Sequence, residues 1–177
     1  MITRRFTRVD LTNVSEDYLL KVGEEAYISF NNVSSIPLRI ATTNDTFYEL
    51  HLLNSNPGTN SHILYGRVYL FPNNTVYDNF RVSLIYRSSG GHATIYYLED
   101  PGFSIGASFF VAIAWLINRK QYKNVRTVSN LYGWGGYYPL YWEASTDWGD
   151  TTTEWTSLGT IVYPAPASGE IIVRRLM

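Results

Sequence analysis

The segment Gly102-Phe-Ser-Ile-Gly-Ala-Ser-Phe-Phe-Val-Ala-Ile-Ala-Trp-Leu-Ile117 is the most apolar part of the sequence and the strongest indication of its fold class. Large side chains fall on one parity and mostly small ones on the other, which is the period of a strand. We therefore expect one long central strand over 103–117, buried on both faces, with its small-residue face against a second layer or a neighbouring subunit. A buried helix over 107–118 is the competing interpretation. The segment is shorter than the ~20 apolar residues that cross a bilayer.

Working outward, the chain divides into twelve short strand-like runs separated by clusters of Asn, Gly, Pro, Ser and Asp. Segments such as Ser55-Asn-Pro-Gly and Asp100-Pro-Gly supply the backbone angles at which a chain reverses. This spacing predicts an all-β fold: an antiparallel β-sandwich, with a jelly roll as one form of it, of about ten to twelve strands and little or no helix. No linker or repeat interrupts the pattern, so we expect residues 1–177 to form a single domain.

The composition excludes several classes of protein. Of the 177 residues, 45% are hydrophobic, 16% aromatic and 16% charged, which excludes a disordered chain. A formal net charge of -1 argues against a protein that binds nucleic acid or an anionic membrane through charge. The chain has no Cys, which removes disulfides, thiolate nucleophiles and Cys-ligated metals. We expect no cofactor.

The amino terminus, Met1-Ile-Thr-Arg-Arg-Phe-Thr-Arg-Val-Asp10, carries charges without an apolar stretch behind them. A secretory signal peptide needs such a stretch and a cleavage site of small residues. We therefore expect the protein to be made and folded in a cytoplasm.

No arrangement of residues points firmly to catalysis. The three histidines, His51, His62 and His92, lack metal-ligand spacing, and a place on a sheet surface is the favoured interpretation of His51. Asp147 and Asp150 are weak candidates for a hard cation, because their spacing lacks the pattern of a calcium loop. We expect a protein that is not an enzyme. The least favoured alternative is a hydrolase that degrades glycans with acids drawn from Glu99, Glu143, Asp147, Asp150 and Glu154.

Basic residues cluster mildly in three places: Arg4, Arg5 and Arg8 near the start, Arg119, Lys120, Lys123 and Arg126 after the apolar segment, and Arg174 with Arg175 near the end. Charges that protect solvated sheet edges are the simplest interpretation. An acidic surface on a partner subunit is the alternative.

The densest local feature is a group of seven aromatic residues between positions 132 and 148. Such rings pack in cores, anchor subunit interfaces, or stack against sugars, and the sequence leaves all three roles open. The candidates for an interface or a glycan-binding site are Tyr132, Trp134, Tyr137, Tyr138, Tyr141, Trp142 and Trp148.

Two segments resemble virion structural proteins of tailed bacteriophages. They are Asp150-Thr-Thr-Thr-Glu-Trp-Thr-Ser-Leu-Gly-Thr-Ile-Val-Tyr-Pro-Ala-Pro-Ala-Ser-Gly-Glu-Ile-Ile-Val-Arg-Arg-Leu176 and Tyr69-Leu-Phe-Pro-Asn-Asn-Thr-Val-Tyr-Asp-Asn-Phe80. The resemblance implies a small β-sandwich protein of the tail, baseplate or capsid exterior that self-associates or docks on other virion proteins. A module that binds a glycan or receptor on the host surface through the aromatic cluster is the alternative. The resemblance assigns no catalytic residue and leaves the position on the particle open.

Overall fold

The computed structural model describes residues 5–11, 14–56, 67–76, 80–87, 93–100, 102–107, 111–120, 122–132, 139–148 and 152–177. Within these ranges the chain forms eleven strands and one turn of 3-10 helix, and no α-helix. In chain order the elements are β1 Thr7–Asp10, β2 Glu24–Pro37, β3 Thr46–Asn56, β4 Arg67–Phe71, η1 Pro72–Asn74, β5 Phe80–Arg87, β6 Ala93–Asp100, β7 Phe103–Ala107, β8 Val111–Arg119, β9 Tyr122–Tyr132, β10 Pro139–Trp148 and β11 Thr160–Arg175.

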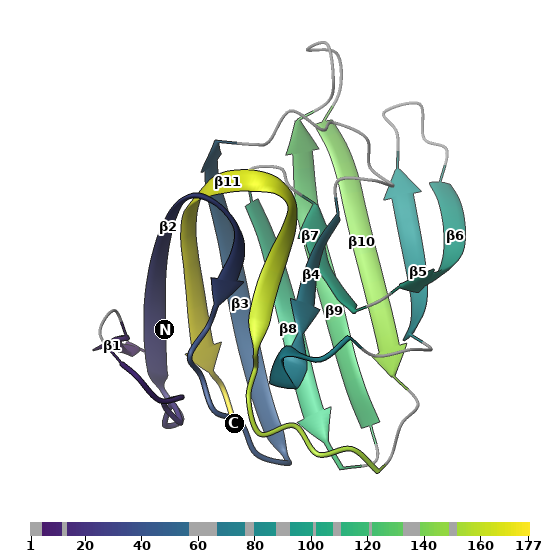
Figure 1. Ribbon diagram of the computed structural model, residues 1–177. Helices are drawn as coiled ribbons and strands as arrows, with labels where there is room; N and C mark the ends of the chain where they lie inside the picture. The colour runs from purple at the N-terminus through teal and green to yellow at the C-terminus, as the bar shows by residue number, and fades with distance from the viewer. Residues whose placement is uncertain are drawn as a thin grey trace.

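The strands join into one continuous mixed sheet in the order β1-β2-β11-β3-β8-β9-β10-β5-β6 (Figure 1). β1 pairs with β2 in parallel, and the other pairings between strands are antiparallel. β4 attaches to β11, and β7 attaches to β4. The all-β prediction is confirmed, whereas the sandwich, the jelly roll and the strand count of the whole chain stay predictions.

The long strand β11 pairs with different neighbours along its length, because it bends. Its first residues, Thr160–Val162, pair with β4 and with the end of β2, whereas Ser168–Arg175 pair with β3 and the start of β2. The register shifts between Val162 and Ala167, where Pro164 and Pro166 supply no backbone N–H for a ladder. The bend brings β4 and β7 over the face of β8 and β9 (Figure 1).

The expected single strand over 103–117 is wrong, because the structure contains two strands in this region with different partners. β7 pairs with β4, whereas β8 pairs with β3 and β9. In β8 the small-residue face is buried at Ala112, Ala114 and Leu116, as predicted, but Ile113, Trp115 and Ile117 are half-buried on the opposite face. The large residues of β8 therefore do not form a core face. The helix over 107–118 does not form either in its described part, since residues 111–118 are extended.

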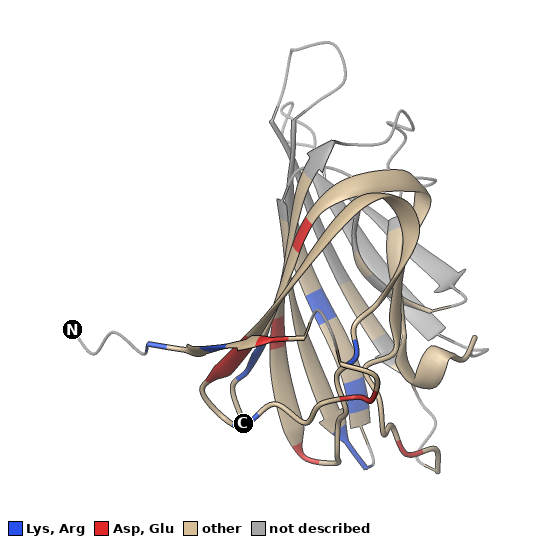
Figure 2. Cartoon of the chain, turned by 60° about the vertical axis from the view of Figure 1, so that its left-hand side comes forward, with Lys and Arg blue, Asp and Glu red and all other residues tan. Residues whose placement is uncertain are grey.

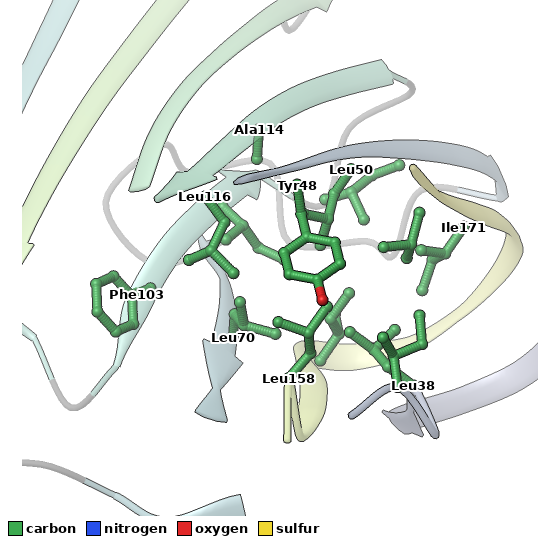
Figure 3. Close-up of a cluster of buried hydrophobic side chains, with 14 of the residues drawn as sticks. Leu38, Tyr48, Leu50, Leu70, Phe103, Ala114, Leu116, Leu158 and Ile171 are labelled. Atoms are coloured by element: carbon green, nitrogen blue, oxygen red, sulfur yellow. The ribbon is translucent and has the colours of Figure 1, made fainter. Parts of the chain in front are cut away.

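The core lies between the inner face of β3, β8 and β11 and the segments that cover it (Figure 3). The alternating residues of β3 are fully buried, and β4 and β7 contribute Leu70 and Phe103 from the opposite side. Tyr48 is buried at the centre and donates its hydroxyl hydrogen to the carbonyl oxygen of Ala41, at 3.3 Å. Such burial of apolar area is the main term that stabilises a fold without disulfides.

The two segments that carry the resemblance lie side by side in the fold. Asn73, which adopts φ of 54°, accepts hydrogen bonds at Oδ1 from the backbone N–H groups of Thr156 (2.9 Å) and Ser157 (3.0 Å). Its Nδ2 donates to the carbonyl oxygen of Glu154, at 2.9 Å. The η1 turn therefore holds the segment that leads into β11.

Gly159 sits against this turn, and we predict that an added methyl group will be strongly destabilising. A Cβ atom on Gly159 would lie 2.0 Å from the carbonyl oxygen of Phe71, and the residue has φ of +73°. Gly159→Ala should lower the free energy of unfolding by at least about 2 kcal/mol, measured by urea denaturation. Gly23→Ala is the matched control, because Gly23 has φ of +88° but no atom within 4 Å of its Cβ position. Equal losses in both variants would contradict the steric explanation.

A second prediction concerns the contribution of Tyr163 to stability at high pH. Burial raises its pKa well above the ordinary value of about 10. The hydroxyl group donates a hydrogen bond to Asn54 Oδ1, at 2.7 Å. A group with a raised folded-state pKa stabilises the fold below its unfolded pKa, and this contribution disappears as pH rises through the folded value. At pH 7 the free energy of unfolding of Tyr163→Phe should be about 1 kcal/mol lower than that of wild type. Between pH 9 and pH 11 it should fall less in the variant than in wild type. Thermal melts at the three pH values check this, and parallel pH curves would contradict it.

Candidate functional site

The structure places only part of the predicted aromatic cluster. Trp134, Tyr137 and Tyr138 lie outside the described residues. Tyr132, Tyr141 and Trp142 belong to the β9–β10 hairpin, in which Trp142 is paired with Ser129 and Tyr141 with Asn130. For these six residues, interface and glycan binding stay predictions.

Trp148 belongs to the core, which is one of the three roles that the sequence left open for this cluster. Its side chain is 5% exposed and stacks on Trp155, with ring centroids 5.7 Å apart. Lys123 is also fully buried, and its Nζ lies 5.3 Å from the ring of Trp148 and 5.6 Å from that of Trp155. A solvated edge is therefore the wrong interpretation of Lys123, because this position of β9 faces inward, where two indole rings stabilise its cation.

The predicted acids are separated or lie partly outside the described residues. Arg81 of β5 is paired with Asp147 of β10 on one side and with Glu99 of β6 on the other, so a strand separates the two acids. Glu154 is exposed, and its Oε1 accepts a hydrogen bond from Asn44, at 3.3 Å. Asp150 lies outside the described residues, and Glu143 belongs to strand β10. In the described part of the chain no three His, Asp or Glu residues gather as metal ligands would.

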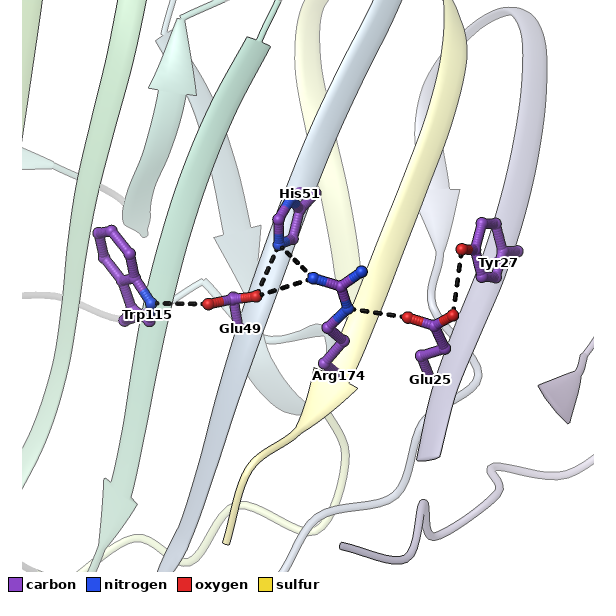
Figure 4. Close-up of polar contacts among 6 residues, drawn as sticks. All are labelled: Glu25, Tyr27, Glu49, His51, Trp115 and Arg174. Atoms are coloured by element: carbon purple, nitrogen blue, oxygen red, sulfur yellow. Dashed lines mark hydrogen bonds and ion pairs between the residues drawn. The ribbon is translucent and has the colours of Figure 1, made fainter. Parts of the chain in front are cut away.

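The outer face of the sheet instead carries a polar network that the sequence did not reveal (Figure 4). Arg174 of β11 lies between two acids, donating from Nε to Glu25 Oε2 at 2.8 Å and from Nη1 to Glu49 Oε1 at 3.2 Å. Trp115 of β8 donates from Nε1 to the other oxygen of Glu49, at 3.1 Å. The acids that neutralise Arg174 thus come from its own chain, so Arg174 does not need an acidic partner subunit.

His51 completes this network. Its Nε2 lies 2.7 Å from Glu49 Oε1. An ionised carboxylate only accepts, so the contact with Glu49 needs a proton on Nε2, and Nη1 of Arg174 lies 3.2 Å from the same nitrogen. Burial opposes the ionisation of Glu49, but hydrogen bonds from His51, Trp115 and Arg174 outweigh it and hold the pKa of Glu49 below its ordinary range. The sheet-surface position predicted for His51 is confirmed, whereas His62 and His92 lie outside the described residues.

Beside this network, the outer face has an open hollow of about 630 Å³. Trp115 lies at the junction, since it contacts Glu49 on β3 and is paired with Arg126 on β9. Because side chains alternate between the two faces of a strand, Glu49, Trp115 and Arg126 lie on one face of the sheet, and the strand pairing fixes their spacing. The hollow is lined by Phe47, Trp115, Ile117, Asn124, Arg126 and Val128.

A second open space, of about 530 Å³, lies along the edge strand β2, where the strand bends. Its apolar lining includes Val14, Phe30, Val33 and Leu38, and Val33 is 38% exposed. We call this space the β2 groove. β1 covers only the first part of this edge, at Glu24–Tyr27. The backbone of β2 beyond Tyr27 has no strand partner on this side within the described residues.

Comparison with protein-family models, curated proteins and solved structures finds no match. No helix in the described part of the chain has the length and apolar character to span a membrane. The geometry of the two open surfaces is therefore the basis for a functional assignment.

We predict that Glu49 makes the stability of the protein sensitive to acid. A carboxyl group with a lowered folded-state pKa stabilises the fold above its unfolded pKa of about 4.3, and this contribution disappears as pH falls through the folded value. Glu49→Gln should cost about 1–2 kcal/mol at pH 7 and less at pH 3, measured by urea denaturation at both values. Glu170→Gln is the control, because Glu170 is exposed and makes no ion pair in the described part of the chain. A loss of equal size at both pH values would contradict this prediction.

Proposed function

We propose that this chain is a non-enzymatic structural protein of a bacteriophage particle, which self-associates or docks on other virion proteins. In this proposal it is made in the host cytoplasm and carried in the virion, at the tail, the baseplate or the capsid exterior. Neither nucleic acid nor membrane is among its partners, in keeping with the net charge of -1.

The observation that carries the proposal is the uncharged edge of β2. No charged residue occurs between Glu25 and Arg39, although sheet edges are commonly protected by charges against pairing with another chain. In Figure 2 the arch formed by β2 and β11 is tan over most of its length. The β2 groove lies along this edge, so a strand from a neighbouring subunit could add its backbone to β2 and its apolar side chains to the groove.

The place of the two resembling segments in the fold supports the same proposal. The turn at Asn73 and the start of β11 form one unit that holds the bend of the sheet. A virion protein of this kind must keep its shape without disulfides, and this unit does so through backbone hydrogen bonds to a single side chain.

The sandwich belongs to this proposal as well. The bent ends of β2 and β11, together with β4 and β7, would be the second layer that covers β8 and β9. In such an architecture the β2 groove is the open side between two layers, where a neighbour gains most by covering apolar side chains. A jelly roll is a finer form of the same proposal.

Mass spectrometry of purified particles tests the virion assignment directly. We expect peptides of this chain in particles purified by density gradient, at a constant ratio to the major capsid protein from one preparation to the next. Their absence from particles that also contain the other structural proteins would overturn the assignment.

The docking role of β2 has a separate test. Val33→Lys places a charge at the exposed side of the groove, and we expect it to weaken self-association or incorporation into particles at least about tenfold. Val22→Lys is the matched control, because Val22 is 59% exposed and does not line the groove. Analytical ultracentrifugation and particle incorporation measure the effect. If the two variants associate and enter particles equally well, β2 is not part of the docking surface.

A further inference from the structure

We propose that the outer-face hollow beside Trp115 binds the ring of an uncharged pyranose sugar. This site is separate from the β2 groove, and it does not include the aromatic cluster at 132–148. It adds a ligand to the outer face, whether or not the protein is part of a virion.

The first argument is the fixed position of the indole ring. Trp115 is half-buried, and its only ring N–H donates to Glu49, which is itself held by Arg174 and His51. An aromatic ring that is already ordered loses little conformational entropy when a ligand stacks on it. The network at Glu49 therefore acts as a support that positions Trp115.

The second argument is the chemistry of the hollow. Phe47, Ile117 and Val128 give it an apolar floor beside the indole, and the exposed Arg126 brings a guanidinium to the same space. Asn124 also lines the hollow, but it is buried and its Nδ2 donates to Ser145 Oγ and to the carbonyl oxygen of Thr146. A pyranose has an apolar face of C–H groups and a perimeter of hydroxyl groups. A mostly apolar site with a few placed polar groups fits such a molecule, and about 630 Å³ lies within the usual range for small-ligand sites.

The third argument is the charge balance, which favours an uncharged sugar. Across the sheet, Glu25 is paired with Arg174, Arg174 with Glu49, Glu49 with Trp115, and Trp115 with Arg126. The two acids and the two guanidinium groups of this row cancel in formal charge. The row as a whole therefore has no net charge to attract an acidic sugar, and Arg126, the charged residue in the lining of the hollow, is already engaged in an interaction within the protein.

Polar atoms beyond the hollow extend the site. Nη2 of Arg174 and Nδ1 of His51 have no hydrogen-bond partner among the described residues, and their side chains are 26% and 20% exposed. They lie on the side of Trp115 away from the hollow, across Glu49. A second sugar unit linked to the first would meet the guanidinium of Arg174 and the imidazole of His51 there.

Saturation-transfer NMR on the full chain tests the proposal, with the methyl α-pyranosides of glucose, galactose and mannose, and glucuronic acid as the anionic comparator. We expect transfer to the C–H protons of at least one uncharged sugar and less to glucuronic acid. Trp115→Ala should weaken the binding about tenfold, and Trp115→Phe should weaken it less because it keeps a ring.

Two further variants keep the result interpretable. Arg126→Ala should weaken binding while leaving the indole in place, and Tyr69→Ala, which removes a half-buried ring on β4, should leave it unchanged. Circular dichroism confirms that each variant is folded. The proposal is overturned if wild type binds none of the three uncharged sugars, if glucuronic acid binds best, or if folded Trp115→Ala binds as wild type does. It is also overturned if Trp115→Ala alters only the association of the protein with itself.

Discussion

Strand β11 has to pair with three strands that cannot all lie in one flat sheet, and the rest of the structure depends on how it does so. Its first residues join β4 and the end of β2, and its later residues join β3 and the start of β2. The change of direction falls at Tyr163-Pro-Ala-Pro, where two residues lack a backbone N–H. Across this bend, Ser168 Oγ accepts a hydrogen bond from the backbone N–H of Asn32, at 2.9 Å.

The bend creates two surfaces of opposite character. On the inner side, Leu70 of β4 and Phe103 of β7 belong to the same buried cluster as the small residues of β8. On the outer side, the large residues of β8 are left half-buried, and the polar network around Glu49 lies beside them. This separation explains why the most apolar segment of the sequence contributes both to the core and to a surface.

The two proposed binding surfaces follow from the same arrangement. The β2 groove opens where β2 turns from one part of the sheet to the other. Most of its lining residues are apolar, although Arg39 is among them, and residues 26–38, from β2 and just after its end, carry no charge. The outer-face hollow lies on β3, β8 and β9, where Trp115 has polar neighbours on both sides. The first surface suits a protein strand and the second a small ring with hydroxyl groups, so one chain can serve both partners without competition.

The sequence by itself determined the all-β class, the buried small-residue face at Ala112 and Ala114, and the surface position of His51, because strand alternation and turn chemistry are local properties. It could not reveal that 103–117 contains two strands, that Lys123 is buried beside two indole rings, or that Arg174 contacts Glu25 and Glu49. Those facts depend on which strands become neighbours. Strand pairing joins residues more than a hundred positions apart, so only the tertiary structure decided the register that assembles the network and the hollow.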